Sequence, residues 1–412
     1  MSWNGPLSAS TPRLKGLTVE EARARMLAAV TPLPAESIAL AEADGRVLAQ
    51  PVIAHRDQPP FDASAMDGWA VRRADLAAET TLRIVGESAA GHGYVQPLKA
   101  GEAVRIFTGA PIPAGADLVV IQEEAVREGE TVRLGPAGQP NHVRPRGGDF
   151  HTGETLLAAG VKLDPWRLSL AAAAGQAALS VARRPRIVLL ATGEELAQPG
   201  DTPGPFQIFE SGGVGLAAMI RRWGGEPHRL AATGDDIAAI ADAVREVQAD
   251  LIVTVGGASV GDHDLVKPAL ETLGLTLAVE TINIRPGKPT WFGTLGAKTP
   301  GGGRRVLGLP GNPASAFVCA ELFLKSLVLA MLGADPAPRL ELIALAQSLP
   351  ANGPREHWAR ARITPGGVRA FADQDSSLVT VFAQADALLR RAANAPAAGE
   401  GELVEILRLE RG

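Results

Sequence analysis

The chain has 412 residues, of which 46% are hydrophobic and 21% charged. This length exceeds one ordinary hydrophobic core and predicts about two to four domains. The 40 basic and 45 acidic residues give a net charge of −5. That balance excludes a general attraction to polyanions, so we expect no nucleic-acid partner, and any anionic ligand must be held locally.

The sequence has the features of neither a secreted protein nor a membrane protein. The opening MSWNGPLSAS lacks the basic flank and apolar run of a signal peptide. No later run reaches the roughly 18 apolar residues of a membrane helix. The single cysteine, Cys319, lies in an apolar run, so a disulfide framework is impossible and a buried helix position is expected. These features predict a cytoplasmic protein.

In chain order, four regions with different sequence patterns follow one another. Thr18 and Glu21 have capping-box spacing ahead of a helical pattern that ends near residue 30. Residues 53–143 contain short apolar runs between glycine and proline turns, which indicates a β-rich insertion. In residues 183–333, β-type runs alternate with helix patterns, which predicts a parallel sheet with crossover helices. Residues 334–412 return to short segments typical of a small terminal β domain.

Ligands of open α/β sheets bind beyond the carboxyl ends of the strands, so the loops there are the first candidates for a site. The loop ATGEEL (191–196) presents Glu194 and Glu195, two carboxylates able to hold a metal or its waters. The alternative is that the pair merely begins a helix and suits its dipole.

A second loop, GGASVGDHD (256–264), combines three glycines with small residues and lets backbone N–H groups approach a ligand before a helix begins near Asp262. Asp262, His263 and Asp264 add oxygen and imidazole donors. Turns need glycine too, so the alternative is an ordinary turn. The proposed ligand-binding members of this loop are Gly256, Gly257, Ser259 and Gly261.

A third loop, GLPGNPASA (308–316), places Asn312 as a natural N-cap and Pro313 at the first helical position, with Pro310 fixing the approach. Between the last two loops, INIRPGKPTWFG (282–293) supplies Arg285 and Lys288 on a proline-stiffened segment suited to neutralising phosphate charge. Taken singly, the former is a well-made helix start and the latter a pair of solvated surface cations.

The β-rich insertion also contains two unusual segments, FDASAMDGWA (61–70) and RIFTGAPIPAGADLVVIQEE (105–124). They are rich in small residues, prolines and carboxylates at positions where a simple domain would have bulky core residues. Asp67 and Thr108 are the strongest functional candidates there.

Together these strings resemble the MoeA family, including the corresponding domain of gephyrin. Its members carry PxFDxSAMDGYA, RIxTGAxxPxGAD, a TGDEL loop, GGxSxGxxD, PGKP and LPGNPxSA in this order. The resemblance implies a multidomain α/β plus β fold with a three-layer α/β molybdopterin-binding domain at 183–333. It further implies an elongated two-segment domain at 16–52 and 144–182, the insertion at 53–143, and a C-terminal β-barrel-like domain at 334–412.

The resemblance also implies an activity. Members are homodimers whose cleft faces the partner's β-rich insertion, and they insert molybdate into adenylylated molybdopterin with Mg²⁺-dependent release of AMP. The implied enzyme is a molybdopterin molybdenumtransferase of molybdenum cofactor biosynthesis, with the molybdopterin adenylyltransferase and apo-molybdoenzymes as protein partners.

Carried over residue by residue, the family's functional positions fall on the motifs quoted above. The implied metal and oxyanion ligands are Glu195 and Asp264. The implied substrate contacts are the glycine loop together with Arg285, Lys288, Pro310 and Pro313. The implied catalytic residues are Asp67, Thr108, Asp149, Glu195, Asp235 (or its neighbour Asp236) and Asp264.

Some positions depart from the family pattern. Members commonly carry a D-S/T-N-type string where this chain has ESGG (210–213), a lysine at Arg285 and a basic residue at Thr281, and DSSLVTVF (375–382) matches poorly. These changes leave open a catalytically weak paralogue that binds molybdopterin or acts as a scaffold. The related adenylyltransferase is a second alternative, disfavoured by GGASVGDHD and the extra domains. A hydrolase using Ser259 and His263 lacks a third orienting group.

Overall fold

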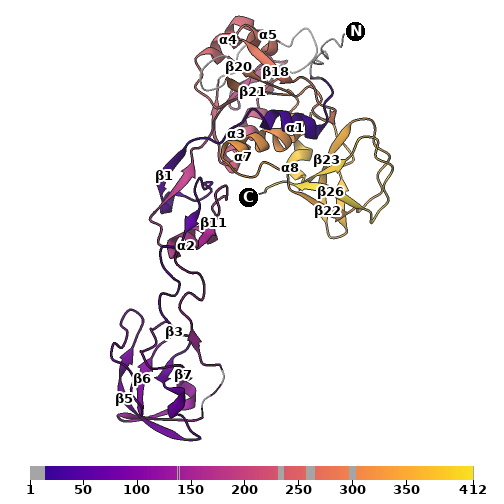
Figure 1. The fold of residues 1–412 in the computed structure, drawn as a ribbon. Helices are drawn as coiled ribbons and strands as arrows, with labels where there is room; N and C mark the ends of the chain where they lie inside the picture. The colour runs from indigo at the N-terminus through magenta and orange to yellow at the C-terminus, as the bar shows by residue number, and fades with distance from the viewer. Residues whose placement is uncertain are drawn as a thin grey trace, which may run out of the picture. The chain divides into compact units, whose positions relative to one another are not determined.

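A computed structural model describes residues 14–136, 138, 140–230, 236–256, 265–296 and 303–411. The chain divides into two compact units. Unit 1 comprises Met1–Glu36 and Ala182–Gly412, and unit 2 comprises Ser37–Val181. Unit 1 holds an α/β domain and the C-terminal β domain, and unit 2 holds the β-rich insertion (Figure 1).

The α/β domain of unit 1 is built on a six-stranded sheet. Its strands in spatial order are β16 (Glu226–Arg229), β13 (Arg186–Ala191), β17 (Leu251–Val255), β21 (Arg304–Leu309), β20 (Trp291–Leu295) and β18 (Leu275–Val279). The first four run parallel, as the alternating pattern predicts. Strand β17 is buried along its whole length, which is typical of a strand covered on both faces.

The other edge of this sheet corrects the prediction of a parallel sheet throughout. Strand β20 pairs antiparallel with both β21 and β18. A parallel neighbour needs a crossover of about a dozen residues, usually a helix, whereas antiparallel neighbours do not. The segment from β18 to β20 is short and contains no helix. Trp291 of β20 is fully buried, and a Cβ at Gly308 would lie 2.0 Å from its ring, so the glycine makes room for the indole.

Helices cover both faces of the sheet, which gives the expected three layers (Figure 1). One face carries α4 (Ile237–Arg245) and α5 (Val266–Glu271), whose Ile240, Val244 and Val266 share a core with the sheet. The other face carries α1 (Val19–Leu27), α3 (Gly212–Trp223), α6 (Pro313–Cys319) and α7 (Lys325–Met331). The capping box of α1 is confirmed, since Thr18 and Glu21 cap each other's backbone N–H groups.

Helices α6 and α7 are continuous through a π-helical turn, Ala320–Leu324. The resulting helix, Pro313–Met331, is long and apolar enough to cross a membrane by composition, contrary to the expectation that no segment would be. Two charged residues, Glu321 and Lys325, interrupt its sequence. However, 83% of its apolar window is buried inside the protein, as in a core helix.

The C-terminal domain forms a second six-stranded sheet. Its strands are β19 (Ile284–Arg285), β23 (Glu356–Thr364), β25 (Ala387–Arg391), β26 (Leu403–Arg408) and β22 (Leu340–Ala344), with β24 (Gly367–Ala370) paired to β23. A bridge from Leu345 to Val368 brings the ends of the sheet toward closure. A short helix, α8 (Val379–Gln384), precedes β25. The predicted strands are confirmed, but the donation of β19 from the α/β domain was not foreseen.

Unit 2 contains the six-stranded sheet of the insertion. Its order is β7 (Leu118–Ile121), β4 (Gly68–Val71), β6 (Glu102–Ile106), β5 (Thr80–Ser88), β9 (Thr131–Leu134) and β8 (Ala125–Glu128). Alternate residues of β4 enter different cores, Trp69 and Val71 one and Ala70 the other, so both faces are covered.

The remainder of unit 2 is a smaller core around α2 (Pro165–Ala173), which Asp164 caps. Short strands pair here and at the entry to the insertion. The pairs are β1 (Ala35–Ala39) with β12 (Ala178–Ala182), β2 (Val52–Ile53) with β11 (Thr155–Leu157), and β3 (Ala63–Ser64) with β10 (Val143–Arg144). Single 3-10 turns lie at Leu40–Glu42, Arg73–Asp75 and Gln122–Glu124.

Candidate functional site

Three loops meet at the carboxyl edge of the parallel strands, as their positions after those strands predict. Ala191, Val255 and Leu309 end β13, β17 and β21 in matching register. Gly256 follows with φ +97°, and a Cβ there would lie 2.8 Å from the carbonyl oxygen of Thr192. Glycine is therefore required where the first two loops touch. Gly311 of the third loop lies against Gly256.

Several predicted site residues lie outside the described residues. They are Asp235, Gly257, Ser259, Gly261 and Asp264, together with the rest of the glycine loop. Their assigned roles remain predictions. Among the described residues, no group of three or more histidine, cysteine, aspartate or glutamate side chains could hold a metal ion.

The first loop carries Glu194 and Glu195, both exposed. The alternative that they begin a helix is wrong, because a turn leads directly into β14 (Leu196–Ala197), which pairs with β15 (Ile208–Phe209). The Glu195 carboxylate folds back over Gly193, where a Cβ would lie 2.4 Å from Oε2. The carboxylate thus stays at the strand edge and open to solvent.

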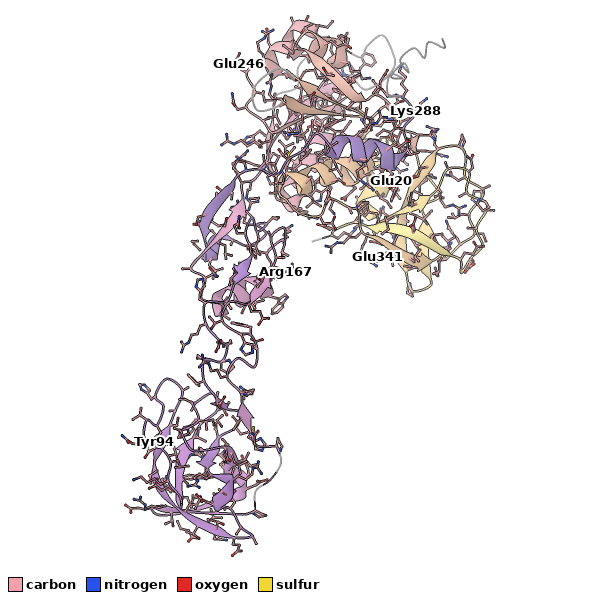
Figure 2. All side chains as sticks on the ribbon, viewed as in Figure 1. Glu20, Tyr94, Arg167, Glu246, Lys288 and Glu341 are labelled. Carbon is pink, nitrogen blue, oxygen red and sulfur yellow. The ribbon has the colours of Figure 1, made fainter. Side chains whose placement is uncertain are left out.

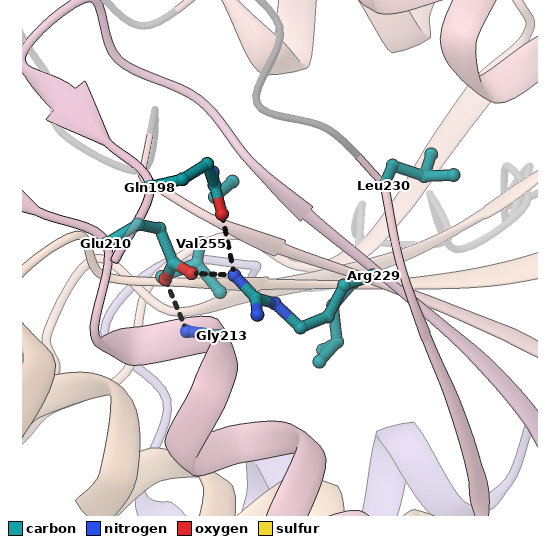
Figure 3. Close-up of a pocket in the computed structure, with 8 residues that line it drawn as sticks. Gln198, Glu210, Gly213, Arg229, Leu230 and Val255 are labelled. Atoms are coloured by element: carbon teal, nitrogen blue, oxygen red, sulfur yellow. Dashed lines mark hydrogen bonds and ion pairs between the residues drawn. The ribbon is translucent and has the colours of Figure 1, made fainter. Parts of the chain in front are cut away.

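Beside this loop lies an ion pair with a buried carboxylate, which sequence analysis missed. Arg229 Nη2 and Glu210 Oε2 are 2.5 Å apart, and Glu210 is 3% exposed (Figure 3). A cavity of about 10 Å³ adjoins the pair, which is room for about one water molecule. It is too small for a pterin or nucleotide. Glu210 belongs to the ESGG segment, which departs from the family pattern. In this chain the side chain at that position is used in an internal ion pair.

The larger cavity is a groove of about 600 Å³ between the α/β domain and the C-terminal domain. Both predicted cations, Arg285 and Lys288, line it and are exposed (Lys288 is labelled in Figure 2). The rest of the lining is Pro286, Gly287, Pro289, Ser315, Arg355 and residues 372–376. Sequence analysis missed Arg355 and residues 372–374, and it noted residues 375–382 only as a poor match to the family. The pairing of β19 with β23 is what brings Arg355 close to Arg285.

Cations gather around this groove. Arg285 pairs in register with His357, and burial together with the nearby Arg285, Arg360 and Arg355 lowers the pKa of His357 to about 4. Arg360 is fully buried and donates to the backbone oxygen of Asp375. No acceptor for its Nη2 lies among the described residues. A buried guanidinium N–H without a partner is costly and favours a nearby anion.

Two carboxylates moderate this positive charge. Asp375 accepts from the hydroxyl of Ser377 at 2.6 Å and from its backbone N–H at 2.8 Å, and these bonds lower the pKa of Asp375. Asp373 also faces the groove. Asp375 stays ionised near neutral pH but is already engaged by Ser377, and Asp373 accepts from the backbone N–H of Asp375 at 2.8 Å. The open side chains of the groove are therefore mainly basic.

The start of α6 forms one wall and corrects a detail of the prediction. Pro313 occupies the first turn and Asn312 the N-cap position, as expected, but the Asn312 side chain does not cap the helix. It donates instead to the hydroxyl of Ser376 at 3.0 Å, while the Ser376 carbonyl accepts from Ala314 N–H. A neighbouring backbone oxygen has thus taken the capping role. Pro310 immediately follows β21 at the strand edge.

Unit 2 holds the remaining candidates. Asp67 Oδ1 accepts from the backbone N–H of Thr108 at 2.7 Å and from its hydroxyl at 2.8 Å, which lowers the pKa of Asp67. The structure thus brings these two predicted residues together. Arg105 supports them, donating to the Gly68 carbonyl and lying over the rings of Trp69 and Phe107.

Asp149 lies elsewhere in unit 2. It is exposed in the turn after β10, and its N–H donates to the carbonyl of Gln58. The turn is clamped by Asp57, which accepts from Arg146 Nε at 2.5 Å and from Thr152 N–H at 2.8 Å. Asp149 therefore presents its carboxylate from a fixed backbone.

With this geometry established, the chain can be compared with known proteins. Residues 17–175 match the profile of the MoeA N-terminal region (domains I and II). Residues 188–330 match a probable molybdopterin binding domain, and residues 343–409 match the MoeA C-terminal region (domain IV).

Individual relatives extend over most of the chain. The "Molybdopterin molybdenumtransferase 2" of Mycobacterium tuberculosis (strain H37Rv) is 36% identical over 383 residues, which cover 89% of this chain and 92% of that protein. The "Molybdopterin molybdenumtransferase" of Synechococcus elongatus is 38% identical over 363 residues, covering 84% and 87%. A crystal structure of the molybdopterin biosynthesis moeA protein from Pyrococcus horikoshii OT3 matches with a TM-score of 0.84 and 25% identity, covering 96% of this chain and 100% of that chain.

The electrostatics of the groove predict a specific pH dependence of stability. Because the folded-state pKa of His357 is about 4 against a reference value of 6.5, the unfolded chain binds this proton more tightly. The free energy of unfolding should fall as the pH drops from about 6.5 to 4, with His357 contributing about 2 kcal/mol after allowing for solvent screening. Urea unfolding of His357→Gln should show a shallower acid loss than the native chain. Equal slopes for both would contradict this, and substitution of the exposed His92 by glutamine is the control.

Proposed function

Because the chain belongs to the MoeA family of molybdopterin molybdenumtransferases, we propose that it inserts molybdenum into molybdopterin in molybdenum cofactor biosynthesis. Its substrates in this proposal are molybdate and adenylylated molybdopterin, and AMP is the second product. Both substrates are anionic. The observation that carries the proposal is therefore the basic groove between the α/β and C-terminal domains.

Size and charge of the groove both suit these substrates. Its volume of about 600 Å³ lies within the range of small-molecule sites. Arg285, Lys288 and Arg355 open into it, and Arg360 lies buried behind the 373–376 segment. Guanidinium groups bind phosphate or molybdate oxygens through paired hydrogen bonds, while the lysine contributes a compact charge. The groove would hold the oxyanion and the phosphate side of the substrate.

The strand edge would supply the other half of the site. Gly256 packs against Thr192, and Gly311 packs against Gly256, so the loops meet at this edge without side chains, and the pterin would lie against them. In this proposal a molybdate oxygen attacks the adenylyl phosphorus, and molybdopterin phosphate is the leaving group of the phosphoanhydride. The Mo–O bond of the resulting adenylyl–molybdate ester then breaks, so AMP leaves with that oxygen, while the two dithiolene sulfurs lose their protons to solvent and bind the metal. Arg285 and Lys288 would offset the charge on the departing phosphate.

Mg²⁺ is part of this proposal. Such ions often use only one or two protein carboxylates, with substrate phosphates and waters completing the shell. The exposed carboxylate of Glu195, held at the strand edge, fits one such ligand, and Asp264 is the proposed second. Bound there, the ion would neutralise phosphate charge and orient the attacking oxygen.

We propose further that the protein is a homodimer and that Asp67, Thr108 and Asp149 complete the site of the partner subunit. Support comes from a group of exposed apolar side chains just before β15, on β15 and in the first turn of α3, since such patches mark protein contacts. They are Phe206, Ile208, Phe209 and Val214, with exposed fractions of 92%, 62%, 48% and 46%. The division into domains at 16–52 with 144–182, 53–143, 183–333 and 334–412 belongs to the same proposal.

The first experiment measures AMP release from adenylylated molybdopterin in the purified protein. We expect release to require both molybdate and Mg²⁺. Asp264→Ala should abolish it while circular dichroism and the melting temperature stay unchanged, because removing a loop carboxylate costs little packing. Substrate binding without turnover in the native chain would instead favour the scaffold alternative.

A second prediction concerns Arg285, which replaces the family lysine. Arg285→Lys should weaken binding of adenylylated molybdopterin several-fold, about 1 kcal/mol for one lost charge-assisted hydrogen bond, and Arg285→Ala should weaken it more. Isothermal calorimetry gives both affinities. Since Arg285 is exposed, neither change should alter the melting temperature much. Equal affinities for the lysine and alanine variants would place Arg285 outside the site.

A third prediction tests the shared site by mixing two inactive variants, Asp67→Ala from unit 2 and Glu195→Ala from unit 1. After subunit exchange, half of the dimers should be mixed, and each would regain one intact site. The mixture should therefore recover about a quarter of the native AMP-release rate. No recovery in a mixture shown by mass spectrometry to contain mixed dimers would mean that each chain builds its site alone.

A further inference from the structure

The segment that carries Glu194 and Glu195 is joined along its length to the segment before α3. Ile208 N–H donates to the Glu195 carbonyl at 2.8 Å, and Glu210 N–H donates to the Ala197 carbonyl at 2.8 Å. The side-chain amide of Gln207 donates to the Glu194 carbonyl at 3.1 Å. Wherever the 207–210 segment is fixed, the Glu195 loop is therefore fixed with it.

Glu210 is the point at which this two-stranded ribbon is anchored to the domain. Its buried carboxylate accepts from Gly213 N–H at 2.5 Å, in the first turn of α3, and from Arg229 Nη2 at 2.5 Å, at the end of β16 (Figure 3). The same Arg229 nitrogen donates to Gln198 Oε1 at 3.3 Å, directly after β14. One ion pair thus joins the sheet, the helix and both strands of the ribbon.

We infer that Glu210 and Arg229 are positioning residues that hold the Glu195 loop at the strand edge. The carboxylate of Glu210 is buried and needs its cation, because a buried charge without a partner is strongly unfavourable. The pair therefore acts as a rigid support rather than as a surface contact. This inference rests on the proposed function only where it concerns turnover.

The same contact has a consequence for substrate binding. The positive end of the twelve-residue helix α3 is a place where phosphates bind readily in other proteins. Here the chain's own carboxylate already occupies it. A Cβ at position 213 would lie 3.1 Å from both Glu210 oxygens, so glycine leaves the pair room without displacing it. The ESGG segment thus occupies this helix end with a carboxylate of its own.

The test uses the double variant Glu210→Gln/Arg229→Met in the full chain, since removing both charges avoids an unpaired buried ion. Hydrogen–deuterium exchange of the peptide spanning residues 194–198 should speed up by about tenfold or more, while exchange in strands β22–β26 stays unchanged. The activation constant for Mg²⁺ should rise several-fold, with the KM for molybdate unaltered. The single variant Arg229→Lys keeps both charges of the pair, and its Mg²⁺ activation constant should stay close to the native value.

The matched control is Glu341→Gln/Arg408→Met, which removes an exposed pair of the same residue types, 2.8 Å apart, from the C-terminal domain. It should change neither the 194–198 exchange nor the Mg²⁺ constant. Unchanged exchange at 194–198 in the test variant would overturn the inference. Faster exchange throughout unit 1 would do the same, since the pair would then be a general stabiliser. If the native chain releases no AMP, the exchange experiment still decides the anchoring, and only the proposed function fails.

Discussion

The basic groove between the α/β domain and the C-terminal domain depends on one short stretch of β pairing. Strand β19 comes from the α/β domain but joins the C-terminal sheet, with Ile284 opposite Glu356 and Arg285 opposite His357. Directly after it, Gly287 packs so tightly on Cys319 of α6 that a Cβ would lie 2.1 Å from the sulfur. Lys288 follows Gly287 directly. Both walls of the groove are therefore fixed to the same segment of chain.

This attachment explains how like charges can remain together. Four arginines lower the pKa of His357, and such a group would separate if flexible loops carried it. Here Arg285 and His357 lie on paired strands, and the 373–376 segment is tied to α6 through Ser376. The backbone holds the cations near each other at a cost in repulsion. An anion in the groove relieves that repulsion, so binding energy comes from a framework that already exists before the ligand arrives.

Local signals in the sequence predicted the parts of the structure that local physics determines. The capping box at Thr18 and the three loops after β13, β17 and β21 are examples, because strand order in an α/β sheet brings successive carboxyl ends together. Antiparallel β20 and the transfer of β19 could not be predicted in this way. The partners of β20 lie close by in the chain, but nothing in its own residues sets its direction. The two-residue strand β19 pairs with β23 far along the chain and leaves no periodicity. Arg355 was missed for this second reason, and the Glu210–Arg229 pair was missed because burial is not visible in sequence.

The tight packing of Cys319 has a practical side. Burial raises the pKa of its thiol to about 12, although a hydrogen bond from Thr290 acts in the opposite sense. At pH 7 the thiol therefore stays protonated, and the thiolate is the form that reacts with disulfide reagents. Because Gly287 packs directly on the sulfur, separation of this segment from α6 would expose it. Because it is the chain's one thiol, its labelling rate would report the rate at which the groove wall opens. Slower labelling with an anion bound would report closure without any attached probe.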